Sequence, residues 1–90
     1  PVLVVQNDIG NRFSTESIVV AIRDLHEGKM LPVFVRVSRG TAGLRKQSIV
    51  DAGHVVTVPK EALGEWVGRM PATVMEEVNR ALRVSLGLGS

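Results

Sequence analysis

The sequence contains no cysteine and only two histidines, His26 and His54. Without cysteine these residues form no disulfide, no thiol nucleophile and no zinc site built on sulfur ligands. Two histidines are too few for a metal cluster built on imidazole, so we expect neither a metal ion nor another cofactor. The lack of cysteine also fits an intracellular protein, and we expect it in the cytoplasm.

Aromatic side chains are scarce, with two phenylalanines, one tryptophan and no tyrosine. A protein that stacks successive bases of a single strand on aromatic rings is therefore disfavoured. No apolar run approaches the roughly 18 residues of a membrane span, and no basic segment typical of a signal peptide opens the sequence. We expect a soluble protein that does not bind a membrane.

The composition is that of a folded globular protein, with 44% apolar and 22% charged residues in 90. A chain of this size makes one domain, here residues 1–90, and buries only about 60 to 65% of its unfolded surface. The net charge of +2 permits a nucleic-acid partner but does not require one.

Several short segments have the pattern of β-strands. Residues 2–5 and 18–22 are continuous runs of branched and aliphatic side chains, which predicts strands buried on both faces in the middle of a sheet. Residues 33–37 alternate, with valines on one face and Phe34 and Arg36 on the other. Further strands are expected at residues 48–50, 55–58 and 65–69, with Trp66 of the last one packed inward.

Polar and glycine-rich stretches separate these strands. Residues 7–17 read as a loop, either a plain connector or a site of anion contact. Residues 23–29 read as a charged turn ending near Gly28, with His26 exposed. Residues 38–47 carry glycines and basic side chains, and form either a solvated hairpin loop or a phosphate contact. Gly53 suggests a β-bulge or a close backbone approach.

The C-terminal part has a different period. Within residues 71–85, apolar side chains recur at spacings of three and four, which predicts an amphipathic helix that ends near Gly87. A single helical turn is expected before it, at residues 59–63. The connections between strands are too short for helical crossovers. The expected fold class is therefore mostly β with a C-terminal helix, built on an antiparallel, strongly bent sheet or small barrel.

Five segments together resemble a known family. They are PVLVVQND (residues 1–8), IGNRFS (9–14), IVVAI (18–22), GLRKQSIV (43–50) and MEEVNRALRVSLGL (75–88). This series is similar to the MazF/PemK (Kid/CcdB-like) family of type II toxin endoribonucleases, and the likeness covers nearly all 90 residues. The block PVLVVQNDIGNRFS is its most specific part.

The resemblance implies a small SH3-like barrel with a C-terminal helix, of the MazF/PemK/CcdB toxin type. It also implies a symmetric homodimer that cleaves single-stranded mRNA at selected sequences without a metal. A cognate antitoxin would wrap the dimer and block its RNA groove, and the complex would reach DNA through the antitoxin.

The sequence departs from the family pattern at three places. The family's first strand, its long loop and a catalytic arginine directly before the proline at Pro1 are not among residues 1–90. Arg23 stands where the family usually has a threonine that acts at the site. Gly53 and His54 stand where the family has Glu-Gln, and Val56 replaces a family arginine.

Cleavage through the 2′-hydroxyl needs a base, an acid and groups that hold the phosphate charge. His54 is the catalytic candidate for acid or base, because histidine readily exchanges a proton near neutral pH; the alternative is a structural histidine at a bulge. Arg23 is the catalytic candidate for phosphate charge, or else a solvated strand end. Asp51 is a lesser candidate that shares the face of Gly53 in a regular strand. The RNA-binding candidates matching the family are Asn7, Arg12, Ser14 and Ser48.

Two interpretations follow for the family segment that precedes Pro1. In the favoured one, the natural chain continues upstream with the strand and arginine, and the protein cleaves RNA. In the other, these residues are the whole protein, a degenerate toxin without cutting activity. The alternative function is a toxin-fold module that acts by binding a protein, gyrase included.

Overall fold

The computed structural model describes residues 1–25 and 30–88. The turn expected near Gly28 and the exposure expected for His26 lie outside these residues. The elements in chain order are β1 (Val2–Val4), α1 (Asp8–Phe13), β2 (Glu16–Asp24), β3 (Phe34–Val37), the 3₁₀ turn η1 (Thr41–Gly43), β4 (Ser48–Pro59), the 3₁₀ turn η2 (Lys60–Ala62) and α2 (Ala72–Ser85).

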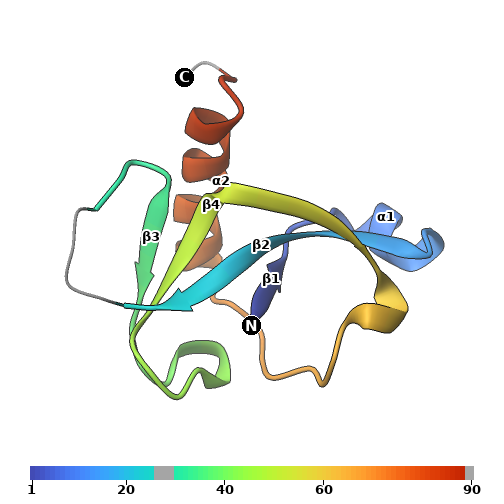
Figure 1. The fold of residues 1–90 in the computed structure, drawn as a ribbon, viewed down its shortest axis with the longest axis horizontal. Coiled ribbons are helices and arrows are strands. Elements are labelled where there is room, and N and C mark those ends of the chain that lie inside the picture. Colours follow the sequence, from blue (N-terminus) through green and yellow to red (C-terminus); the bar gives the residue numbers. More distant parts are fainter. Residues whose placement is uncertain (26–29, 89–90) are drawn as a thin grey trace.

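The four strands form one antiparallel sheet in the order β1-β2-β4-β3. The long strands β2 and β4 cross the molecule together and bend, and α2 lies behind β4 and β3 (Figure 1). The antiparallel pairing follows from the short connections, which leave no room for crossover helices. The predicted class, mostly β with a C-terminal helix, is confirmed.

The prediction that residues 2–5 form a strand in the middle of the sheet is wrong. β1 is an edge strand of the described sheet, pairing with β2 alone. Val2 and Val4 are 47% and 36% exposed, and Leu3 between them packs against the core. An aliphatic run of this length has the same pattern in a central and an edge strand, so the position depends on pairing partners that periodicity does not reveal.

The strands predicted at residues 48–50 and 55–58 are parts of one strand, β4. Its register with β2 shifts between Val20, which pairs with Val55, and Ala21, which pairs with Asp51. Residues 52–54 are therefore without partners on β2, as in a bulge. The irregularity predicted from Gly53 is confirmed, while the interruption of the strand is not.

The core lies between the sheet and α2. Val35 and Val37 of β3 point into it, as their alternation predicted, and Arg36 between them is exposed. The amphipathic helix is confirmed, with Val78 and Ala81 buried on its inner face. Among the described residues no helix is long and apolar enough to cross a bilayer. The buried cluster comprises Val20, Ile22, Val35, Val37, Val50, Ala52, Met70, Val78 and Ala81.

The strand predicted at residues 65–69 does not form, and Trp66 is 78% exposed instead of packed inward. The backbone of this segment lies against η1. A Cβ atom on Gly68 would come within 2.3 Å of the carbonyl oxygen of Ala42. Glycine allows this approach, and the segment therefore contacts the 3₁₀ turn and does not pair with a sheet edge.

The loop predicted over residues 7–17 contains the short helix α1. Asn7 is its N-cap, with a side-chain oxygen that accepts a 2.8 Å hydrogen bond from the Gly10 amide. The asparagine that suggested a turn thus starts a helix, because the same side-chain bond serves both structures. The helical turn expected at residues 59–63 is confirmed as η2.

Candidate functional site

Two arginines lie on the sheet face opposite α2. Arg23 of β2 pairs with Ile49 of β4, which in turn pairs with Arg36 of β3. Directly opposed residues of antiparallel strands point to the same face. Because the next residues, Ile22 and Val35, are buried in the core beneath α2, this row points away from the helix. Both arginines are exposed.

Arg23 forms an ion pair with Asp51, the neighbour of that row on β4. An Nη2 nitrogen of Arg23 lies 2.8 Å from Oδ2 of Asp51. The Arg23 side chain is 55% exposed, whereas that of Asp51 is 9% exposed. The other carboxylate oxygen, Oδ1, accepts a 2.9 Å hydrogen bond from the Gly53 amide. Asp51 therefore connects β2 to the irregular part of β4.

The irregular part of β4 beside this pair contains Gly53 and His54. A Cβ atom on Gly53 would lie 3.1 Å from Oδ1 of Asp51 and 3.3 Å from Cγ2 of Val33, so glycine keeps space for the carboxylate. Asp51 and Gly53 were expected to share a face in a regular strand, and they lie side by side here although the strand is irregular. His54 follows directly and is exposed. Within residues 1–25 and 30–88, no three acidic or histidine side chains are grouped to hold a metal ion.

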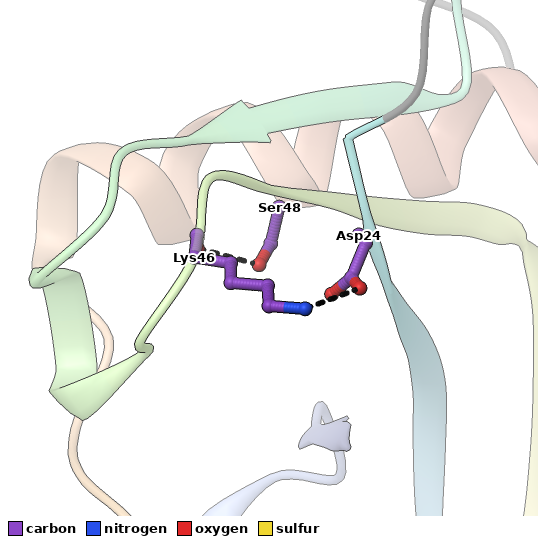
Figure 2. A network of polar contacts seen from close by, with 3 residues as sticks. All are labelled: Asp24, Lys46 and Ser48. Carbon is purple, nitrogen blue, oxygen red and sulfur yellow. Dashed lines mark hydrogen bonds and ion pairs between the residues drawn. The ribbon is translucent and has the colours of Figure 1, made fainter.

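Ser48 lies at the border of the Arg23 site, in a small polar group with Asp24 and Lys46 (Figure 2). The Lys46 ammonium lies 3.5 Å from Oδ2 of Asp24, and both side chains are largely exposed. The Ser48 hydroxyl donates a 3.0 Å hydrogen bond to the Lys46 carbonyl, and Ser48 is 4% exposed. The hydroxyl of this RNA-binding candidate is thus buried and already bonded.

The other RNA-binding candidates lie around α1, at the far end of β2 (Figure 1). Asn7 caps the helix, and Ser14 accepts a 3.1 Å hydrogen bond from the Glu16 amide. The Arg12 guanidinium is exposed and lies 5.5 Å from the centre of the Phe13 ring. Because a strand rises about 3.3 Å per residue, the length of β2 from Glu16 to Arg23 separates this group from Arg23 by about 23 Å.

A hydrogen-bonded network at the α1 end has no counterpart among the features predicted from the sequence. Gln6 continues the β1–β2 ladder, since its side-chain oxygen accepts a 3.0 Å bond from the Ile18 amide. The buried Ser17 hydroxyl donates to the Asn11 side chain at 3.0 Å. The Lys60 ammonium donates to the Asn11 carbonyl and ties η2 to this end. No local pattern indicates these contacts, because Lys60 is far from Asn11 in sequence.

The ion pair between Arg23 and Asp51 was also missed, although both residues were considered. An acidic residue inside the valine-rich run at residues 49–58 was the available signal, since a buried carboxylate needs a partner. The partner depends on the register between β2 and β4, which shifts at this point.

Residues 1–86 match the family described as PemK-like, MazF-like toxin of type II toxin–antitoxin system. The chain belongs to this family. It is 36% identical over 88 residues to Endoribonuclease EndoA of Bacillus subtilis, covering 98% of this chain and 76% of the relative. It is 34% identical over 90 residues to Endoribonuclease MazF of Staphylococcus epidermidis, covering 100% of this chain and 75% of the relative.

The fold agrees with this membership. A solved endoribonuclease in complex with its cognate antitoxin, from Mycobacterial species, superposes with a TM-score of 0.88 at 26% identity. That match covers 100% of this chain and 82% of the solved one. The MazF/PemK resemblance read from the sequence is therefore confirmed, together with the toxin-type fold.

The first residues of the chain pair with β2 close to Arg23. The Ile22 amide donates a 3.0 Å hydrogen bond to the Pro1 carbonyl, and Val2 pairs with Ala21. Asp51 connects Arg23 to the Gly53 amide, which lies directly before His54 in the chain.

Proposed function

We propose that residues 1–90 form the single toxin domain of a toxin–antitoxin pair that cleaves single-stranded mRNA at selected sequences in the cytoplasm. The reaction needs no metal ion. The strongest support is the identity to two endoribonucleases over nearly the whole chain. The exposed arginines on the sheet face opposite α2 supply positive charge for a polyanionic substrate.

The chemistry is attack of the ribose 2′-oxygen on the adjacent phosphorus, with loss of the 5′-oxygen of the next nucleotide. A base takes the 2′-hydroxyl proton and an acid gives a proton to the leaving oxygen. The products are a 2′,3′-cyclic phosphate and a 5′-hydroxyl. We assign one of the proton transfers to His54, which is exposed beside the bulge.

Arg23 stabilises the charge that develops on the phosphate oxygens. A guanidinium carries five N–H donors and keeps its proton, so it can bind a carboxylate and a phosphate together. The ion pair with Asp51 involves Nη2, and the side chain remains 55% exposed. Donors of Arg23 are therefore left for the substrate.

The RNA extends from this centre toward α1, along β2. The exposed guanidinium of Arg12 binds a phosphate there, and Asn7 and Ser14 lie beside it. Their separation from Arg23 means that they contact nucleotides distant from the cleaved bond. Ser48 can donate a hydrogen bond to the RNA only if its hydroxyl leaves the Lys46 carbonyl, because its single proton is already used there.

The protein acts as a homodimer, is inhibited by a cognate antitoxin, and reaches DNA only through that antitoxin. Exposed apolar side chains provide surface for such partners. Val55 and Val56 of β4 are 38% and 41% exposed, and Trp66 is 78% exposed. Light scattering at micromolar concentration tests the dimer, and a monomer there would contradict it.

Cleavage is tested with the protein at its natural length, incubated with defined single-stranded RNA at low salt in the presence of a chelator. We expect products with 2′,3′-cyclic phosphate and 5′-hydroxyl ends. Arg23→Ala should lower the rate about 10²- to 10³-fold, as expected for the loss of a group that stabilises transition-state charge. Arg36→Ala removes the same charge two strands away and should lower it less than about threefold, as loss of a remote charge does.

Two results would contradict the proposal. The first is absence of cleavage across a random RNA pool by the wild-type protein. The second is capture of gyrase, or of an antitoxin peptide alone, by a protein that ignores RNA. If Arg23→Ala and Arg36→Ala lower the cleavage rate equally, both arginines contribute only positive charge for RNA binding, and Arg23 has no special role in cleavage.

A further inference from the structure

Asp51 is a charged residue in an apolar part of the sheet. It is 7% exposed, and its neighbours in β4, Val50 and Ala52, are fully buried. A buried carboxylate is costly unless it is paired, and an apolar side chain of similar volume often stabilises a fold as well or better. Packing therefore does not account for an acidic residue at this position.

Both carboxylate oxygens of Asp51 are used, and they are used on different partners. Oδ2 holds Arg23 of β2 at 2.8 Å, and Oδ1 holds the Gly53 amide at 2.9 Å. The first contact restrains a long side chain that would otherwise sample many rotamers. The second restrains the backbone directly before His54.

We propose that Asp51 is a positioning residue, which holds Arg23 and the bulge that carries His54 in one arrangement for RNA cleavage. This inference rests on the proposed function, since it requires Arg23 to act on the phosphate. Asp51 does not touch the substrate. Its negative charge works against RNA binding, and its contribution is the geometry of the two groups that do touch it.

The substitution Asp51→Asn separates these effects. The amide oxygen can still accept the Gly53 hydrogen bond, so the bulge is retained, but the charge that holds Arg23 is lost. Removal of a negative charge should leave binding of RNA unchanged or make it tighter. The cleavage rate should fall, because Arg23 is no longer held. Misfolding would weaken RNA binding and also lower the cleavage rate. A lower cleavage rate with equal or tighter RNA binding is therefore the result expected of a positioning residue.

Asp24→Asn is the matched control. Asp24 is also an acidic residue near the end of β2, but its carboxylate is exposed and faces Lys46, not Arg23. The control changes the net charge by the same amount at nearly the same place. We expect it to affect RNA binding as Asp51→Asn does and to leave the cleavage rate within about twofold, since exposed pairs contribute little.

The experiment uses the natural-length protein and two measurements. Single-turnover cleavage of a defined RNA gives the rate, and fluorescence anisotropy with the same sequence carrying a 2′-deoxy nucleotide at the cleavage position gives binding. Asp51→Asn should lower the rate about tenfold or more, with equal or tighter binding. In an Arg23→Ala background, the same change should alter the rate less than about twofold, because residues that act as a unit are not additive.

An equal loss in both backgrounds would overturn the inference and make Asp51 structural. An unchanged or faster rate in Asp51→Asn would overturn it too, and would mean that Asp51 is dispensable or withholds Arg23 from the substrate. Failure of the proposed function gives a different result. In that case the wild-type protein does not cleave, or Arg23→Ala cleaves as fast as wild type.

Discussion

The two ends of β2 bury opposite faces of the same strand. At its start Ser17 and Val19 are buried while Ile18 is 38% exposed, and at its end Val20 and Ile22 are buried while Arg23 is exposed. The α1 segment covers the first face, through the bond between Ser17 and Asn11. The core under α2 covers the second. The same strand therefore serves two different environments.

The polar groups at these ends differ in the same way. At the α1 end, hydrogen bonds of Gln6, Asn11, Ser17 and Lys60 join segments of the chain to one another. At the other end, Asp51 holds an arginine whose side chain remains 55% exposed. The hydrogen bonds at the first end stabilise the fold, whereas the arginine at the second end keeps donors open to a ligand. Substitutions at each end should therefore change different measurements.

The largest effect is expected from His54, at the open end. His54→Gln should lower the cleavage rate about 10²-fold or more, because general acid–base catalysis contributes about that much. Single-turnover kinetics measure the rate, and thermal melting should show an unchanged fold, since the side chain is exposed. His26→Gln is the control. A rate equal to that of wild type would make His54 structural and remove it from the site.

A smaller effect, on stability and not on cleavage, is expected at the α1 end. Ser17→Ala removes the hydroxyl that donates to Asn11 in a buried position. The free energy of unfolding should fall by about 1 to 3 kcal/mol, as for other buried polar groups that lose a partner. Urea denaturation measures the loss. A reduced cleavage rate without loss of stability would show that this end, too, belongs to the site.

The smallest effect is expected from Asn7, whose side chain caps α1. Asn7→Ala should lower the free energy of unfolding by about 1 kcal/mol, whereas Asn7→Ser should preserve most of it, because serine also caps helices. Binding of uncleavable RNA distinguishes a second role. If Asn7 contacts RNA, as its family position predicts, Asn7→Ser should weaken binding without loss of stability. RNA binding equal to that of wild type in both variants would leave Asn7 with the cap alone.

Local patterns predicted some elements better than others. The helix Ala72–Ser85 and the alternation in β3 were predicted because each has a clear period and one buried face. The short helix α1 was missed because an asparagine cap and a turn have the same local chemistry. The strand at residues 65–69 was wrong because the approach of Gly68 to Ala42 is a contact between distant segments.

For the candidate site, the types of residue could be predicted from the sequence, but their arrangement in space could not. The chemistry of histidine and arginine side chains makes His54 and Arg23 candidates for RNA cleavage, and the structure links Arg23 through Asp51 to the Gly53 amide directly before His54. The RNA-binding candidates Asn7, Arg12 and Ser14 lie at the opposite end of β2. The length of β2 therefore separates the RNA-binding candidates near α1 from the catalytic candidate Arg23.

The sequence by itself determined the family, the antiparallel class and the C-terminal helix, because each depends on residue order and local periodicity. It also determined that the β4 strand is irregular near Gly53. Only the tertiary structure decided that Asp51 holds Arg23, that β1 pairs with β2 alone in the described sheet, and that the two ends of β2 bury opposite faces. These features depend on strand register and on which segment covers each face, and both are set by contacts between residues far apart in the chain.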